Sequence, residues 1–193
     1  MDAVSLSRNR FRVRDSDDDR DRVLDMARRV FFSFHYQRDS WRVSQVRNSW
    51  LCRAGHEATP FLDGAQWEKI KRQGSRAIQN WIDRQMKGTS VTVVLIGQET
   101  ANRPWVKYEI EQSAKLRKGI VGVRIHNLKN QLRQTDRPGP NPLDKIIVRR
   151  QTIWGGYQNV RVSQIANTYD YYLNNGRLNL SMWIEEAARN ARR

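Results

Sequence analysis

Short apolar runs alternate along this chain with longer segments in which apolar side chains recur every three or four residues. The runs at 30–34, 91–96 and 120–125 are nearly continuous, as expected of strands that are buried on both faces. The segments at 39–50 and 64–86 place their apolar side chains on one face of a helix. This alternation predicts an α/β fold in which helices cover a mainly parallel sheet.

Weaker patterns predict the remaining elements. A short second strand is expected around 60–62, and Pro104 suits the first position of the helix that follows the run at 91–96. An edge strand is expected at 145–148. Short helices are expected at 169–173 and 182–191, and the second of these is predicted to be a surface helix with a basic end.

Residues 1–25 differ in composition from the rest of the chain. They contain seven aspartates and six arginines with few bulky apolar side chains, so they cannot bury enough surface to offset the entropy of ordering. We expect this segment to be disordered or to be a non-native N-terminal extension, with Met26 as the biological start. Mass spectrometry of the native protein tests this, because an intact Met1 peptide would refute it. Residues 26–193 are predicted to form a single domain.

The formal net charge of +15 raises the question of an anionic partner. Lysines and arginines are scattered through every predicted helix and loop, which is typical of a solvated surface and makes nucleic acid an unlikely partner. Cys52 is the only cysteine, which excludes an internal disulfide framework and a multi-cysteine zinc site. The chain has no apolar run long enough to span a membrane and no signal-peptide core, so we expect a cytoplasmic protein.

Glu109 is the residue whose position most favours chemistry. It lies in the first turns of a predicted helix that follows the strand at 90–97, and open α/β sheets bind ligands at that edge. Residues 33–36 leave the first strand at the same edge. The residues alone also allow Glu109 to be a solvated helix glutamate, as Glu111 is expected to be.

Four ordered segments resemble the TIR-like family, in particular the TIR-like proteins of bacterial Thoeris anti-phage systems. They are the first strand and its exit at 30–36, Phe61-Leu62-Asp63 followed by Trp67, the strand at 90–97, and the helix start at 103–110. The resemblance covers roughly residues 26–193.

The resemblance implies a flavodoxin-like (TIR-like) three-layer fold with a mainly parallel sheet of about five strands. It also implies an enzyme of the NAD⁺ glycohydrolase or ADP-ribosyl cyclase type, with NAD⁺ as substrate and no metal or other cofactor. A phage component would trigger the activity, and a cyclic ADP-ribose-type product would diffuse to a separate NAD-consuming effector. Self-assembly is expected, because a loop of one protomer commonly completes the site of another.

One carboxylate can be enough for this reaction. Nicotinamide in NAD⁺ is a cationic leaving group that departs neutral, so it needs no general acid, and the transition state resembles an oxocarbenium ion at the ribose. A carboxylate can hold the ribose hydroxyls and stabilise the growing positive charge. With the resemblance, Glu109 is the predicted catalytic residue.

Other residues are assigned to NAD⁺ binding, and each has an ordinary structural interpretation. Hydroxyl, amide, aromatic and cationic groups could cradle the dinucleotide, whereas the same side chains could serve as core, loop contacts, helix cap or surface. The assigned residues are Ser33, Phe34, His35, Asp63, Arg103 and Trp105.

Two other functions compete with the enzyme. One is a non-catalytic TIR-like interaction module that recruits partners through its helix surfaces. The other is a basic nucleic-acid-associated domain, which steep salt-dependent retention on DNA would reveal.

Overall fold

The computed structural model describes residues 28–52, 57–60, 64–151 and 154–191. Its main sheet has five parallel strands in the order β2–β1–β3–β4–β7. Their bounds are β1 (Arg29–Ser33), β2 (Glu57–Ala58), β3 (Val91–Ile96), β4 (Gly119–Arg124) and β7 (Thr168–Asp170). This arrangement confirms the predicted α/β, flavodoxin-like fold. Residues 1–25 and Asp63 lie outside the described residues.

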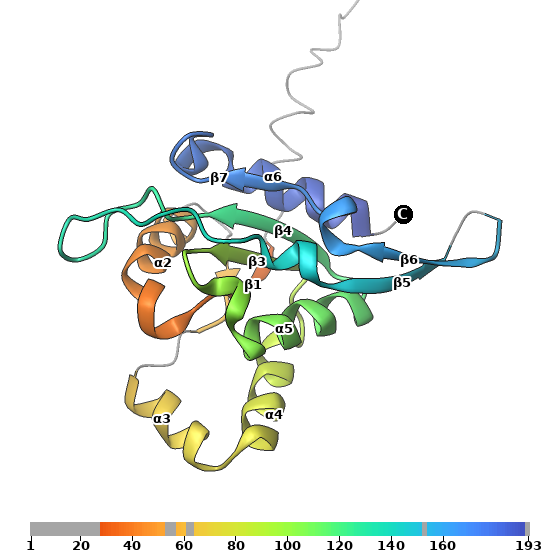
Figure 1. The fold of residues 1–193 in the computed structure, drawn as a ribbon, viewed down its shortest axis with the longest axis horizontal. Helices are drawn as coiled ribbons and strands as arrows, with labels where there is room; N and C mark the ends of the chain where they lie inside the picture. The colour runs from red at the N-terminus through yellow and green to blue at the C-terminus, as the bar shows by residue number, and fades with distance from the viewer. Residues whose placement is uncertain (1–27, 53–56, 61–63, 152–153, 192–193) are drawn as a thin grey trace, which may run out of the picture.

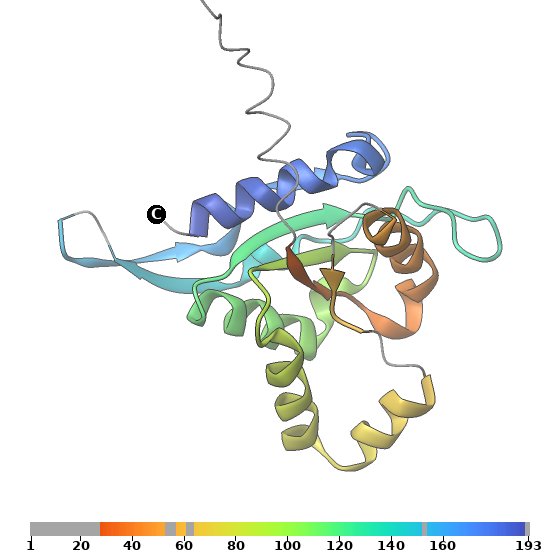
Figure 2. The ribbon, with the colours of Figure 1, turned by 180° about the vertical axis from the view of Figure 1, so that it is seen from behind.

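Helices cover both faces of this sheet (Figures 1 and 2). One face is packed by α2 (Tyr36–Leu51) and α6 (Gly176–Ala191), and the other by α4 (Ser75–Met86) and α5 (Pro104–Lys115). The remaining helix, α3 (Gly64–Arg72), precedes α4. Within the described residues, none of the helices is long and apolar enough to cross a bilayer.

The central strand β3 shows why the layers form. Every residue of β3 is buried, and side chains alternate between the two faces. Val93 and Leu95 pack in the cluster under α2 and α6, while Val94 packs in the cluster under α5. Each such side chain contributes roughly 1.5–3 kcal/mol when it is removed from water, so β3 supports both layers.

The structure corrects two predictions in the first half of the chain. The helix expected over 64–86 is two helices, because Gly74 has a φ of 90° and separates α3 from α4. The first helix begins at Tyr36, three residues before the segment at 39–50 over which it had been expected. The strand that pairs with β1 lies at 57–58, and residues 61 and 62 of the segment where a second strand had been expected lie outside the described residues.

The C-terminal third differs more from the prediction. Residues 168–170 form β7, the fifth strand of the sheet, where a short helix at 169–173 had been expected. The final helix begins at Gly176, and its Trp183 and Ile184 are buried against the sheet, so it is not a surface helix. The local pattern at 169–173 favours a helix, but pairing with β4 makes residues 168–170 a strand. Tertiary contacts override the local preference here.

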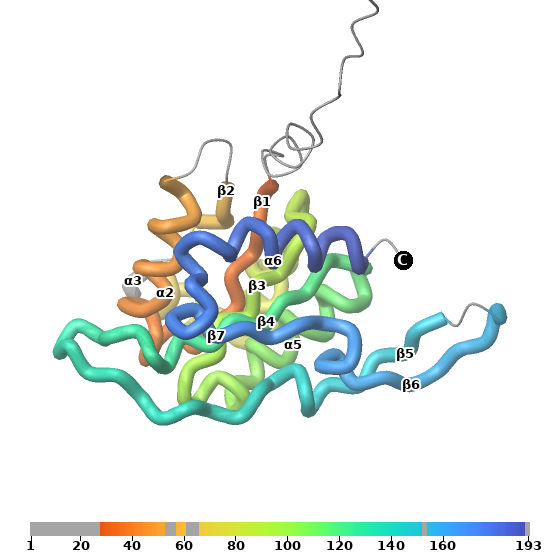
Figure 3. Tube along the Cα trace, turned by 90° about the horizontal axis from the view of Figure 1, so that it is seen from above, coloured from red at the N-terminus to blue at the C-terminus, as the bar shows by residue number. Residues whose placement is uncertain are grey.

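The expected edge strand belongs to a separate hairpin. Residues 142–145 form a 3₁₀ turn, and β5 (Ile147–Gln151) then pairs antiparallel with β6 (Tyr157–Arg161). Figure 3 shows this hairpin extending away from the body of the domain.

Candidate active site

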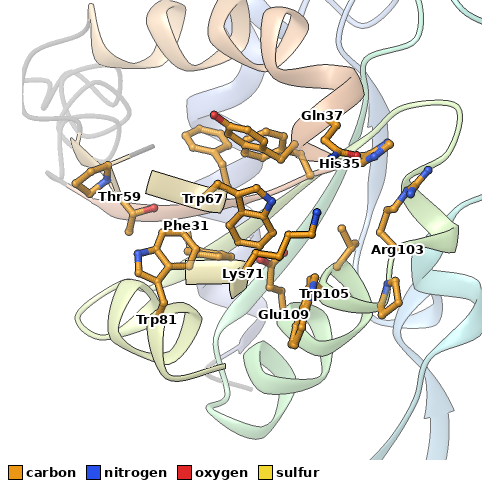
Figure 4. A pocket seen from close by; sticks show the side chains of 16 residues that line it. Phe31, His35, Gln37, Thr59, Trp67, Lys71, Trp81, Arg103, Trp105 and Glu109 are labelled. Atoms are coloured by element: carbon orange, nitrogen blue, oxygen red, sulfur yellow. The ribbon is translucent and has the colours of Figure 1, made fainter. Parts of the chain in front are cut away.

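A cavity of about 300 Å³ opens beside the carboxyl end of β1, between the α3–α4 pair and the start of α5. Aromatic side chains form most of its wall, with a few polar groups among them (Figure 4). The side chains labelled there are Phe31, His35, Gln37, Thr59, Trp67, Lys71, Trp81, Arg103, Trp105 and Glu109.

Glu109 supplies the carboxyl group in this wall. Its side chain is only 8% exposed, and the hydroxyl of Ser33 donates a hydrogen bond of 2.5 Å to its Oε2. Burial raises the pKa of Glu109 to about 8, and the hydrogen bond from Ser33 opposes part of that shift. Glu111, two residues later, is half-exposed and lies 3.8 Å from the ammonium of Lys107. Glu109 is therefore not the solvated helix glutamate that the residues alone allowed.

The start of α5 explains how Glu109 comes to face the cavity. Pro104 occupies the first turn of the helix, and Val106 and Ile110 pack beneath β3 and β4. Trp105 and Glu109, four residues apart, share the face that lines the cavity. The packing of Val106 and Ile110 sets the orientation of the helix. The neighbouring face of the helix then presents the ring of Trp105 and the carboxyl group of Glu109 to the cavity.

The structure places most of the other predicted binding residues around the same cavity. Phe34, His35, Arg103 and Trp105 line it, whereas Ser33 is fully buried and reaches it only through its bond to Glu109. Among the described residues, no group pairs with His35 Nδ1 or Arg103 Nε, although both atoms are buried. Burial, followed by the nearby Arg103 charge, lowers the pKa of His35, so this imidazole is neutral near pH 7.

Ion pairs hold the rim of the cavity. Glu99 pairs with Arg103 and also, at 3.0 Å, with Arg38 on α2. Arg38 in turn lies 3.2 Å from Asp136, which belongs to the long loop after β4. Arg103 is therefore tied, through Glu99 and Arg38, to α2 and to that loop.

Sequence reasoning missed a second group of site residues on α3 and α4. Trp67 and Trp81 had been assigned to the buried face of one long helix, and Lys71 had not been considered. The ring centroids of Trp67 and Trp81 lie 6.2 Å apart, edge to face, and Trp67 is 6.1 Å from Tyr36. Gly74 was the available signal, since a glycine inside a helical pattern lowers the case for a continuous helix.

The geometry suits a cationic ligand with hydroxyl groups. Aromatic faces attract a cationic ring, and a carboxyl group in a low-dielectric wall interacts strongly with any positive charge that develops beside it. Within the described part of the chain, no cluster of three acidic, histidine or cysteine side chains could hold a metal ion.

Comparison with known proteins identifies relatives of this chain. The family described as "Thoeris protein ThsB, TIR-like domain" matches residues 31–130. A protein of Bacillus cereus (strain MSX-D12), named "Putative cyclic ADP-D-ribose synthase ThsB1", is 42% identical over 120 residues. The matched stretch covers 62% of this chain and 62% of that protein, so the chain spans about three fifths of the length of the relative.

Proposed function

This chain belongs to the family of the Thoeris protein ThsB, TIR-like domain, and we propose that it cleaves NAD⁺ between nicotinamide and ribose to make a cyclic ADP-ribose-type signal. The signal would act on a separate effector after phage infection. The name of the Bacillus relative, "Putative cyclic ADP-D-ribose synthase ThsB1", supports the reaction type. The observation that carries the proposal is the buried carboxyl group of Glu109 in the wall of an aromatic cavity.

Glu109 is the proposed catalytic residue. When the glycosidic C–N bond breaks, both electrons leave with nicotinamide, which becomes neutral, and the ribose carbon becomes cationic. The Glu109 carboxylate would stabilise that charge, and the hydroxyl of Ser33 would hold the carboxylate in place. The cavity volume, at the low end of the roughly 300–1,000 Å³ found for ligand pockets, fits nicotinamide and its ribose, with Trp105 beside them.

The remaining groups suit the rest of the dinucleotide. Arg103 and Lys71 supply positive charge at the cavity for the pyrophosphate. His35, as a neutral imidazole, can exchange hydrogen bonds with a ribose hydroxyl.

The aromatic wall also bears on the fate of the ribosyl cation. Capture by water gives ADP-ribose and a proton, whereas capture by a nucleophilic atom elsewhere in the same molecule gives a cyclic product. The cavity wall contains five aromatic side chains that offer water few hydrogen-bond partners, namely Phe31, Phe34, Trp67, Trp81 and Trp105. We therefore expect internal capture to compete well with hydrolysis.

The test is nicotinamide release from NAD⁺, followed by liquid chromatography with mass detection of the nucleotide product. It compares the wild type with Glu109→Gln and with Glu111→Gln as the matched control on the same helix. Both purified protein and extracts of phage-infected cells that express it are assayed, because activation by infection is expected. Glu109→Gln should lower the rate at least 100-fold, and Glu111→Gln should keep it within twofold. Equal rates for wild type and Glu109→Gln, or no turnover in either preparation, would favour a non-catalytic interaction module instead.

A further inference from the structure

A second cavity, of about 370 Å³, lies at the opposite end of the strands from Glu109. Its lining residues lie where β4 begins, at the carboxyl ends of α5 and α6, and along β5 with Tyr157 of β6. Figure 2 shows these elements meeting at the same end of the domain. It shares no lining residue with the candidate active site. The second cavity is therefore spatially separate from the candidate active site.

Five of the residues that line this second cavity are lysine or arginine, and none of its lining residues is acidic. Among the described residues, no salt bridge joins any of the five to a carboxylate. They come from α5, from the α5–β4 turn and from β5, and they are Lys115, Arg117, Lys118, Arg149 and Arg150. Lys118 already donates to the carbonyl of Thr89, and Arg149 and Arg150, as neighbours on β5, leave the strand on opposite faces. The positive charge that remains at the cavity has no acidic counter-ion among the described residues that line it, so a bound anion would be stabilised.

Helix dipoles account for only part of this cluster. Lys115 lies in the last turn of α5, where a cation interacts favourably with the helix end. Arg149 and Arg150 lie on a strand of the hairpin, far along the chain from that helix, and the fold brings them to the same cavity. Their convergence with Lys115 is not explained by local helix capping.

Arg117 provides an independent observation. The amide of Lys118 donates to the carbonyl of Ser113 at 2.9 Å, and the amide of Arg117 donates to that of Ala114 at 3.1 Å. This is the hydrogen-bond pattern that ends a helix with a left-handed residue, a position usually held by glycine. Arg117 occupies it with a φ of 51°. A non-glycine residue there costs of order 1 kcal/mol, so the side chain at this position is retained at the expense of stability.

The shape of the site favours a small ligand. Two helix ends and a hairpin enclose it, and its volume falls in the range of small-molecule pockets. Tyr157 on β6 is 59% exposed, with the guanidinium of Arg149 lying 4.4 Å from its ring centroid. A phosphate group suits the arginines, which bind its oxygens in a bidentate way, and an exposed ring suits stacking with a base.

We propose that this basic cavity is a second ligand site that binds the diphosphate group of a small nucleotide. Gly119 at its floor is pressed against α6, since a Cβ there would lie 2.6 Å from the carbonyl oxygen of Ala187. The floor of the site is thus rigid, and its opposite wall is the hairpin.

Isothermal titration calorimetry of the intact chain at 150 mM NaCl tests the proposal, with ADP and inorganic pyrophosphate as probes. Both should bind saturably at this cavity, in addition to any binding of their phosphates near Arg103 and Lys71 in the candidate active site. Arg149→Ala/Arg150→Ala should weaken this binding at least tenfold, while Arg76→Ala/Arg84→Ala, which removes two exposed charges from α4, should change it less than twofold. Arg117→Gly should weaken binding several-fold while its melting temperature equals or exceeds that of the wild type, so that a folding defect cannot explain the loss.

Three results would overturn the proposal. One is the absence of saturable binding of either probe by the wild type. Another is equal weakening by the two arginine pairs, which would indicate non-specific attraction to net charge. The third is binding of a 20-nucleotide single-stranded DNA that is lost with Arg149→Ala/Arg150→Ala while ADP and pyrophosphate fail to saturate, because the cavity would then be part of a nucleic-acid groove. None of these outcomes bears on NAD⁺ cleavage, which is assayed separately through nicotinamide release.

Discussion

Replacing Glu109 with glutamine should stabilise the protein, and the gain should grow with pH. The folded-state pKa of about 8 lies above the reference value of 4.5 because the carboxyl group is buried. An acid whose pKa is raised in the folded state does not change the free energy of unfolding while it is protonated in both states. It lowers that free energy as the pH rises above the unfolded-state pKa, and the loss is complete above the folded-state pKa.

The size of the effect follows from that difference in pKa. At 1.36 kcal/mol per unit, ionised Glu109 destabilises the fold by roughly 4–5 kcal/mol above pH 8, and by less than about 1 kcal/mol at pH 5. The Glu109→Gln variant keeps an acceptor for the hydroxyl of Ser33 and carries no charge. Its stability relative to wild type should therefore rise by about 4 kcal/mol between pH 5 and pH 9. For a chain of this size that corresponds to a relative gain of roughly 8–16 °C in melting temperature.

Urea unfolding followed by circular dichroism at pH 5, 7 and 9 measures this difference. All other titrating groups, including buried Asp39, are common to both proteins and cancel in the comparison. Glu111→Gln, with a half-exposed side chain, should differ from wild type by less than about 0.5 kcal/mol at every pH. A Glu109→Gln difference that stays constant from pH 5 to pH 9 would refute the buried, protonated carboxyl group.

Four further predictions follow from the same structure. First, kcat/KM for NAD⁺ should rise with pH toward a plateau above about pH 8, because the carboxylate form of Glu109 is needed, and a flat pH–rate profile would contradict this. Second, Ser33→Ala should move that profile to higher pH and lower the rate at pH 7 several-fold, since the hydroxyl lowers the pKa of Glu109; an unmoved profile would show that the bond of 2.5 Å does not tune the acid. Third, Arg42→Ala should destabilise the fold by about 3–5 kcal/mol in urea unfolding, because it leaves buried Asp39 and the carbonyl of Leu128 without their partner; a loss below about 1 kcal/mol would contradict the burial of this pair. Fourth, Gly119→Ala should lower the melting temperature by several degrees, because its Cβ would collide with the backbone of α6, and an unchanged value would show that the two elements can separate.

The sequence predicted the part of the site that depends on strong local patterns. The nearly continuous apolar run at 91–96 identified the central strand, and Pro104 identified the start of α5. Those two elements determine where Glu109 lies, so its position at the edge of the sheet could be predicted from the sequence alone.

The other half of the site depends on a local break and on tertiary packing. A helical spacing of tryptophans indicates one apolar face, and it does not show that Gly74 turns the chain so that Trp67 and Trp81 face a cavity. The strand at 168–170 pairs through only three residues with β4, so its identity comes from its neighbour rather than from its own pattern. The basic cavity could not be predicted for a similar reason, since α5 and β5 meet there only in the folded chain.

Proton release on ligand binding tests the central role of Glu109 most directly. The ligand is a carbocyclic NAD⁺ analogue, which keeps the cationic nicotinamide but cannot be cleaved. Calorimetry at pH 7 in buffers of different ionisation enthalpy gives the number of protons released on binding. A cationic ring beside Glu109 should ionise a carboxyl group whose pKa is about 8, so wild type and Glu111→Gln should each release close to one proton and Glu109→Gln none. Equal proton release by wild type and Glu109→Gln would show that the carboxyl group does not face the bound nicotinamide riboside.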